Sequence, residues 1–206
     1  MKIYPIVEGQ GEVLAMPVLL RRIIHDQANC YGVEIGNPIR RKAYEFTRED
    51  AVKKAVSLAA MQPDCAGIIV VFDGEDICPK EWSAKVQAWC VQAARNVPCQ
   101  VTIAYREYET WFLSSVESLR GRSGIAQDAV TPRDPESKRD AKGELDRLMP
   151  AGRSYSPTVH QASFSAAFDL QQTYQRNRSF RKLVKCLGEL LVDMNQPLPI
   201  WPPTNW

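Results

Sequence analysis

The chain has 206 residues, of which 45% are hydrophobic and 24% charged, and its formal net charge is only +2. This is the composition of a globular protein large enough to bury one sizeable core, and so small a net charge does not by itself indicate nucleic-acid binding. No apolar run approaches the roughly 20 residues that span a bilayer, and the amino terminus lacks a signal-peptide pattern. The six cysteines lack the close spacing of a zinc site or a redox pair. We therefore expect a cytoplasmic protein with reduced cysteines and no membrane partner.

The first half of the chain alternates strand and helix patterns with short connections. Strands are predicted at residues 3–7, 39–44, 67–72 and 99–105, and helices at residues 12–27, 48–61 and 79–95. The third strand is the clearest, because it is short, continuous and rich in β-branched residues. Thr47 is the predicted N-cap of the second helix, and Pro79 opens the third. This order predicts an α/β fold, a mostly parallel sheet with helices on both faces.

The pattern changes after Glu107. A short helix is predicted at residues 108–116, then a polar, basic, exposed loop at 120–142, and helices at about 141–149, 161–174 and 179–194. The last ten residues contain four prolines and cannot be helical, so they either dock as an extended strap or bind a partner. We predict three parts: an α/β core at 1–118, a basic loop and C-terminal helical appendage at 119–195, and a Pro/Trp-rich extended tail at 196–206.

Acidic side chains follow three of the predicted strands at their carboxyl ends. Because the carboxyl ends of parallel strands meet at one edge of a sheet, where ligands bind in such folds, we expect these carboxylates to converge. Their mutual repulsion requires a cation or a shared proton, and oxygen ligands suit Mg²⁺ or Mn²⁺. The candidate catalytic residues are Glu8, Glu12, Asp73 and Glu107, and the candidate metal ligands are Glu8, Asp73, Glu75, Asp76 and Glu109.

Each acidic group also has a simpler interpretation. Glu12 lies in the first turn of a helix, where it can act as a cap, and the preceding glycines could form a dinucleotide-binding turn. Against the dinucleotide alternative, Leu14 occupies the place of the third glycine. Residues 73–76 could form only a polar turn, and Glu109 could cap the next helix while Trp111 packs in the core. The two histidines lie near no recognisable nucleophile.

Four stretches of the sequence carry a resemblance to a known family. They are VEGQGE (7–12), DGED (73–76), IAYREYETWFL (103–113) and RSF (178–180). A lone glutamate after the first strand and an acidic pair after a later one resemble the Toprim domain of topoisomerases, primases and overcoming-lysogenization-defect nucleases. The four stretches together more closely resemble a small stand-alone Toprim-like bacterial family, domain of unknown function 4276. Position 75 is Glu where the Toprim pair has Asp, which places its carboxylate about one methylene farther out.

The resemblance implies a Toprim-like, Rossmann-like fold in which the glutamate and the acidic pair hold Mg²⁺ for phosphoryl transfer. It also implies a separate ATPase partner of the AAA or ABC type, in bacterial defence or DNA repair. The chain has no phosphate-binding loop of the Gly-x-x-x-x-Gly-Lys type, so any ATP dependence must come from that partner.

Clustered basic residues are candidates for phosphate contacts, although charge runs are more often solvated surfaces. The candidate nucleic-acid-binding residues are Arg178, Arg181, Lys182, Lys185, Lys138 and Arg139. We expect a metal-dependent nuclease acting on DNA or RNA. The alternatives are a non-catalytic Toprim-like subunit that binds a metal ion and assembles with the ATPase, and a phosphatase or nucleotidyl-transfer enzyme for small substrates. Assembly into a homo-oligomer stays open.

Overall fold

The protein is described by a computed structural model, which covers residues 1–121, 124–204 and 206. Its strands are Lys2–Val7 (β1), Glu34–Ile35 (β2), Ile39–Arg40 (β3), Cys65–Asp73 (β4) and Cys99–Ala104 (β5). They form one sheet in the order β2-β1-β4-β5, with β3 also paired to β1, and all of these pairs are parallel. The predicted α/β fold with a mostly parallel sheet is confirmed.

Helices connect and flank the strands. They are Gln10–Arg21 (α1), Glu49–Ala60 (α2), Pro79–Ala93 (α3), Glu109–Leu113 (α4), Ala141–Arg147 (α5), Pro157–Ala167 (α6), Leu170–Arg176 (α7) and Arg178–Asp193 (α8). Shorter helical turns are the π-helical Arg22–Gln27 (η1) and the 3-10 turns Ala43–Glu45 (η2), Val116–Leu119 (η3) and Pro135–Ser137 (η4).

Three sequence-based boundaries were wrong. The predicted strand at 39–44 ends at Arg40, because the Glu45 carboxylate accepts a hydrogen bond from the Lys42 amide and closes a 3-10 turn there. The N-cap of α2 is Arg48 rather than Thr47. The predicted helix at 161–174 is two helices, because Phe168 is extended and Asp169 starts α7 by accepting a hydrogen bond from the Gln172 amide.

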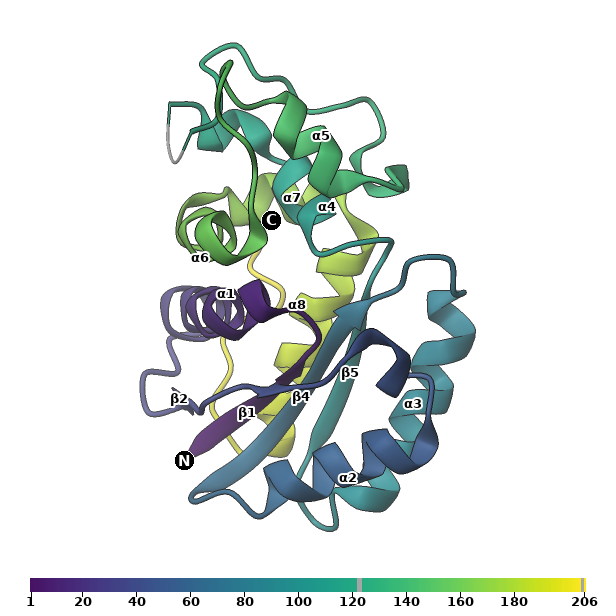
Figure 1. Ribbon diagram of the computed structural model, residues 1–206. Coiled ribbons are helices and arrows are strands. Elements are labelled where there is room, and N and C mark those ends of the chain that lie inside the picture. Colours follow the sequence, from purple (N-terminus) through teal and green to yellow (C-terminus); the bar gives the residue numbers. More distant parts are fainter. Residues whose placement is uncertain (122–123, 205) are drawn as a thin grey trace.

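Helices lie on both faces of the sheet (Figure 1), and the sheet separates two hydrophobic clusters. Successive residues of a strand face opposite sides, so Ile69 and Val71 of β4 join the cluster that includes α1, α4, α6 and α8, whereas Ile68 and Val70 join the α2 and α3 side. Helix α8 packs directly on β5 and β4, so this late segment covers part of one face of the sheet. The proposed division at residues 118 and 195 stays a prediction.

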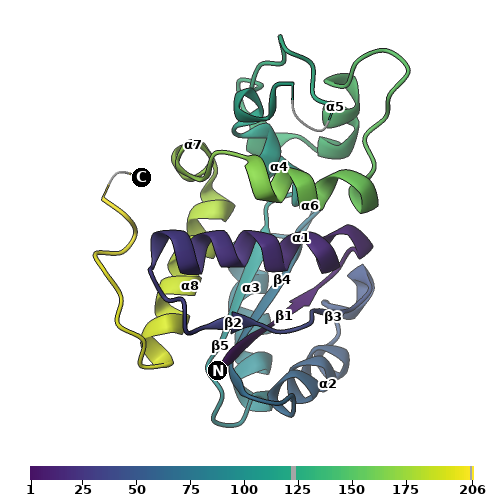
Figure 2. The same cartoon turned by 90° about the vertical axis from the view of Figure 1, so that its left-hand side faces the viewer.

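Helices α4 to α7 lie beyond the carboxyl ends of the strands (Figure 1), and α6 packs along α1. The tail after α8 runs back beside that helix (Figure 2), where the Trp201 indole donates a hydrogen bond of 2.9 Å to the Val184 carbonyl. Trp206 packs against Phe180 and Tyr174. Of the two alternatives for the tail, the structure therefore shows a docked strap. Among the described residues, no helix is both long enough and apolar enough to cross a bilayer.

Candidate active site

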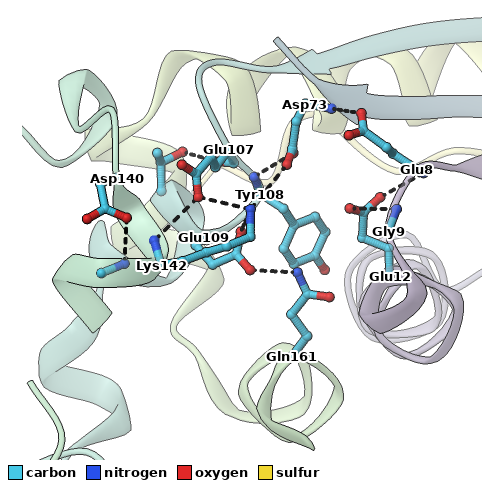
Figure 3. A network of polar contacts seen from close by, with 12 residues as sticks. Glu8, Gly9, Glu12, Asp73, Glu107, Tyr108, Glu109, Asp140, Lys142 and Gln161 are labelled. Atoms are coloured by element: carbon cyan, nitrogen blue, oxygen red, sulfur yellow. Dashed lines mark hydrogen bonds and ion pairs between the residues drawn. The ribbon is translucent and has the colours of Figure 1, made fainter. Parts of the chain in front are cut away.

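Four carboxylates meet at the carboxyl edge of the sheet, and we call Glu8, Glu12, Asp73 and Glu109 the acidic cluster (Figure 3). Glu8 directly follows β1 and Asp73 ends β4, so the pairing of these neighbouring strands brings them together. The Asp73 amide donates a hydrogen bond of 3.2 Å to Glu8 Oε2, and the Tyr108 amide donates one of 2.8 Å to Asp73 Oδ1. The predicted convergence of acids from three strands is present at these residues.

Glu12 both caps a helix and belongs to the cluster. Its carboxylate accepts hydrogen bonds from the amides of Glu8 (3.1 Å) and Gly9 (3.2 Å), which closes the first turn of α1. The residue is only 3% exposed. The capping interpretation is therefore confirmed, and the same bonds hold a carboxylate at the sheet edge.

Glu109 is completely buried at the start of α4. Its Oε1 accepts hydrogen bonds from the Tyr155 hydroxyl (3.0 Å) and from Gln161 Nε2 (2.9 Å). Its Oε2, like Gln161 Oε1, has no hydrogen-bond partner among the described residues. Buried oxygens without a hydrogen bond are costly, so Glu109 Oε2 depends on the nearby Lys142 ammonium, at 3.5 Å, or on a proton for compensation.

Lys142 of α5 supplies a positive charge to the site. Its Nζ lies 3.0 Å from Glu107 Oε2, 3.5 Å from Glu109 Oε2 and 3.7 Å from Asp73 Oδ2. Glu107 also accepts a hydrogen bond from the Lys142 amide, so it is held beside α5. The Lys142 side chain as a whole remains 43% exposed, so the residue lies at the solvent-facing side of the cluster.

The environment favours protonated acids in the cluster. Burial raises the pKa of Glu8, and it raises the pKa of Glu12 to about 7 with a further contribution from the Glu8 charge. Burial and then the neighbouring carboxylates raise the pKa of Asp73, and burial raises that of Glu109. Burial alone lowers the pKa of Lys142, but the surrounding carboxylates raise it overall. The cluster thus holds more potential negative charge than this one ammonium balances.

Two predicted ligands lie in the exposed loop after β4. Asp76 pairs with the guanidinium groups of Arg106 (2.6 Å) and Arg139. Glu75 is exposed with a positive φ of 42°, and its charge contributes to the raised pKa of Glu8. Glu75 therefore flanks the cluster, whereas Asp76 is engaged with arginines.

Within the described part of the chain, no group of three or more His, Cys, Asp or Glu side chains is already arranged to hold a metal ion. The contacts explain this. Oxygens of Glu12 and Asp73 accept hydrogen bonds from backbone amides, and the Lys142 ammonium lies among the carboxylates. A metal ion would therefore have to replace or rearrange part of these contacts.

The predicted nucleic-acid-binding residues are spread over α8 and the segment before α5. Arg178 pairs with Glu136 at 2.9 Å, Lys185 lies 3.7 Å from Glu189, and Lys138 lies 3.9 Å from Glu144. Arg181 donates hydrogen bonds to the carbonyls of residues 174 and 175, and Arg139 pairs with residue 76. Lys182 forms no ion pair with a carboxylate in the described part of the chain, and it lines a groove beside α8.

Sequence reasoning missed the partners that surround Glu109. Tyr155 and Gln161 lie 46 and 52 residues away in the sequence, and no local motif marks either one. In the sequence, Lys142 is one of many basic residues of the predicted loop at 120–142, and nothing singled it out as a site residue. Its one local signal is Asp140, which starts α5 by accepting a hydrogen bond from the Gly143 amide and thereby positions the first turn that carries Lys142.

The fold and site define an α/β protein with a buried acidic cluster at the carboxyl edge of a parallel sheet. The sequence model of the family described as Domain of unknown function (DUF4276) matches residues 7–188. The chain belongs to this family. Comparisons with curated proteins and with solved structures found no match.

Proposed function

We propose that the protein is a Mg²⁺- or Mn²⁺-dependent phosphoryl-transfer enzyme, a Toprim-type nuclease acting on DNA or RNA. The observation that carries this proposal is the acidic cluster: four carboxylates lie together at the sheet edge with raised pKa values, and only Asp73 and Glu109 lie within 4 Å of the Lys142 ammonium. Functional sites are where burial and like charges are combined to shift pKa values in this way. The sequence resemblance to Toprim nucleases supports the same chemistry.

The carboxylates of Glu8, Asp73 and Glu109 offer oxygen ligands for a divalent cation, which would have to replace the Lys142 ammonium that lies 3.5 Å from Glu109 Oε2. These three would hold the ion, with Glu75 at its edge. Such an ion supplies Lewis-acid stabilisation of a phosphate oxygen. Of the chain's own groups, Lys142 brings an ammonium on a partly exposed side chain that can contact a phosphate, and Glu107 holds that ammonium in place at 3.0 Å.

Glu12 is the group that can exchange a proton near neutral pH. Burial raises its pKa to about 7, which suits a general base or acid at physiological pH. It is held by the amides of Glu8 and Gly9, so its carboxylate stays fixed beside the cluster.

Cleavage of nucleic acid by the purified protein with Mn²⁺ tests the proposal. Glu8→Gln and Asp73→Asn are each expected to reduce cleavage at least about 100-fold, as expected when an essential electrostatic group is lost. Glu34→Gln is the matched control, because this glutamate is exposed and its one ion pair among the described residues is with Lys2 at 3.6 Å. Circular dichroism checks that all three variants fold. Full cleavage by both cluster variants contradicts the proposal.

A second candidate is a non-catalytic subunit that binds an ion and assembles with an ATPase. Lys142 favours it, because this ammonium already partly compensates Asp73 and Glu109. Under either candidate we propose a cytoplasmic protein that works with a separate ATPase of the AAA or ABC type. If the wild-type protein, together with the proposed ATPase partner, cleaves neither DNA nor RNA with Mn²⁺, the subunit function is the correct one.

A further inference from the structure

A groove of about 660 Å³ runs between α3 and α8 along β5. Its walls combine apolar, amide and basic side chains. Those that matter here are Lys80, Gln87, Gln100, Tyr105, Arg178 and Lys182. Its volume is within the range of about 300 to 1,000 Å³ that is usual for sites of small ligands.

The groove does not present the free edge of β5 to a peptide strand. The even-numbered carbonyls of residues 98–104 face β4. Pro98 accepts a hydrogen bond from the Ile68 amide, and Ala104 accepts one from the Gly74 amide. The free edge therefore belongs to Val101 and Ile103, which are only 1% and 3% exposed. Strand addition needs accessible backbone groups, so a ligand here must be recognised by side chains.

The charge of the groove suits an anionic ligand. Lys80, Arg178 and Lys182 line it against one carboxylate, Glu136, which is already paired with Arg178 at 2.9 Å. Lys80 and Lys182 form no ion pair with a carboxylate in the part of the chain that the structure describes, and both are exposed. Two free ammonium groups are therefore available for phosphate oxygens.

The rest of the lining suits a nucleobase. Tyr105 offers an aromatic ring next to the aliphatic side chains of the groove, and an arginine guanidinium lies 5.0 Å from its ring centroid. The Gln100 amide and the Ser83 hydroxyl have no hydrogen bond within the described residues, so both can meet the polar edge of a base. Stacking on an aromatic ring beside a basic groove is the usual means of holding unpaired bases.

The groove also begins next to the candidate active site. Cys78 lines it two residues after Asp76, and Tyr105 lines it two residues before Glu107. Cys78 and Tyr105 follow the carboxyl ends of β4 and β5, so one end of the groove lies at the same edge of the sheet as the acidic cluster. In a duplex the bases are stacked and paired, so a base could enter the groove only by flipping out.

We propose that this groove binds an unpaired nucleotide of single-stranded nucleic acid, which makes single strands the substrate class of the proposed nuclease. The role of single strands as a substrate rests on the proposed function, whereas their binding in the groove requires neither metal nor cleavage. Lys80 and Lys182 contact phosphates, and Tyr105 stacks on a base.

Fluorescence anisotropy tests this with the full-length protein, in EDTA, using a labelled single-stranded oligonucleotide and the duplex of the same sequence. Wild-type protein is expected to bind the single strand at least tenfold more tightly. Tyr105→Ala is expected to weaken that binding about tenfold, whereas Tyr105→Phe retains it. Lys80→Ala and Lys182→Ala each reduce the slope of log affinity against log salt by about 0.7.

Lys54→Ala is the control, because Lys54 is exposed on α2 and does not line the groove. Thermal unfolding checks that every variant folds. The inference is overturned if wild-type protein binds neither probe, binds the duplex as tightly as the single strand, or is unaffected by the groove substitutions. A protein that binds single strands through the groove but never cleaves them with Mn²⁺ refutes the proposed function and leaves this inference standing.

Discussion

Replacement of Lys142 by methionine is the most informative single change at the site. Lys142→Met keeps a chain of similar length but removes the ammonium that lies within 3.7 Å of Asp73, 3.5 Å of Glu109 and 3.0 Å of Glu107. Glu109 is completely buried, so it loses its one nearby positive charge among the described residues. We expect the free energy of unfolding to fall.

The size of the loss follows from burial. Removing one partner of a fully buried ion pair costs about 3 to 5 kcal/mol, whereas an exposed pair contributes about 0 to 1 kcal/mol. Lys142 lies between these limits, because its side chain is 43% exposed while Glu109 is not exposed at all. We therefore expect a loss of about 2 kcal/mol at pH 8 without metal. At pH 5 the loss is expected to be smaller, because Asp73 and Glu109 have raised pKa values and take up protons.

Urea unfolding in EDTA at both pH values measures this loss. Lys138→Met is the control, because Lys138 is nearby in the sequence and, within the described part of the chain, its one ion pair is a long surface contact of 3.9 Å with Glu144. It is expected to change the free energy of unfolding by less than about 0.5 kcal/mol. Equal stability of Lys142→Met and wild type at both pH values would refute the assigned role of Lys142 as counter-ion.

Three further predictions concern other contacts. Burial raises the pKa of Glu12 from 4.5 to about 7. Between these pH values the folded protein binds more protons than the unfolded chain, so the free energy of unfolding falls as the pH rises. The expected fall is about 3 kcal/mol, at ~1.4 kcal/mol per pKa unit. Glu12→Gln should remove this pH-dependent fall in urea unfolding without metal. A pH profile of stability that is the same in Glu12→Gln and wild type contradicts this. Gly11→Ala places a Cβ against Gln161 Oε1 and 2.6 Å from the Pro157 carbonyl oxygen, which should lower the melting temperature at a cost of about 1 to 3 kcal/mol. Gly32→Ala, whose Cβ would meet no described atom within 4 Å, should leave the melting temperature almost unchanged. Asn177→Ala removes a buried N-cap of α8 that accepts from the Phe180 amide at 3.0 Å, and a loss of about 2 kcal/mol is expected in urea unfolding; a loss below 0.5 kcal/mol speaks against this cap.

The strands and most helices could be predicted because their signals are local. The run at residues 67–72 is apolar on both faces, as a central parallel strand must be, and it became the core of β4. Where the sequence-based boundaries failed, a local side chain decided the outcome. The helical spacing of apolar residues continues across positions 168 and 169, which is why one helix was predicted. The Asp169 side chain instead accepts a backbone hydrogen bond and starts α7 just after the extended Phe168.

The acidic cluster was predictable only in part. Glu8 and Asp73 follow strands directly, so the parallel topology alone places them at one edge. Asp76 follows the same strand, but its ion pair with Arg106 engages it in the loop, and the sequence alone does not reveal this long-range contact. Gln161 arrives from α6 through tertiary packing on α1, which no spacing in the sequence reveals.

Calorimetric titration of the wild-type protein with Mn²⁺, beside Asp73→Asn, tests the central claim that the acidic cluster holds a divalent cation. Protons should be released on binding, because the raised pKa values of Glu12 and Asp73 leave part of the cluster protonated. We predict saturable binding to the wild type and at least tenfold weaker binding to Asp73→Asn. Absence of binding to the wild type at millimolar Mn²⁺, or equal binding to both proteins, would contradict the claim.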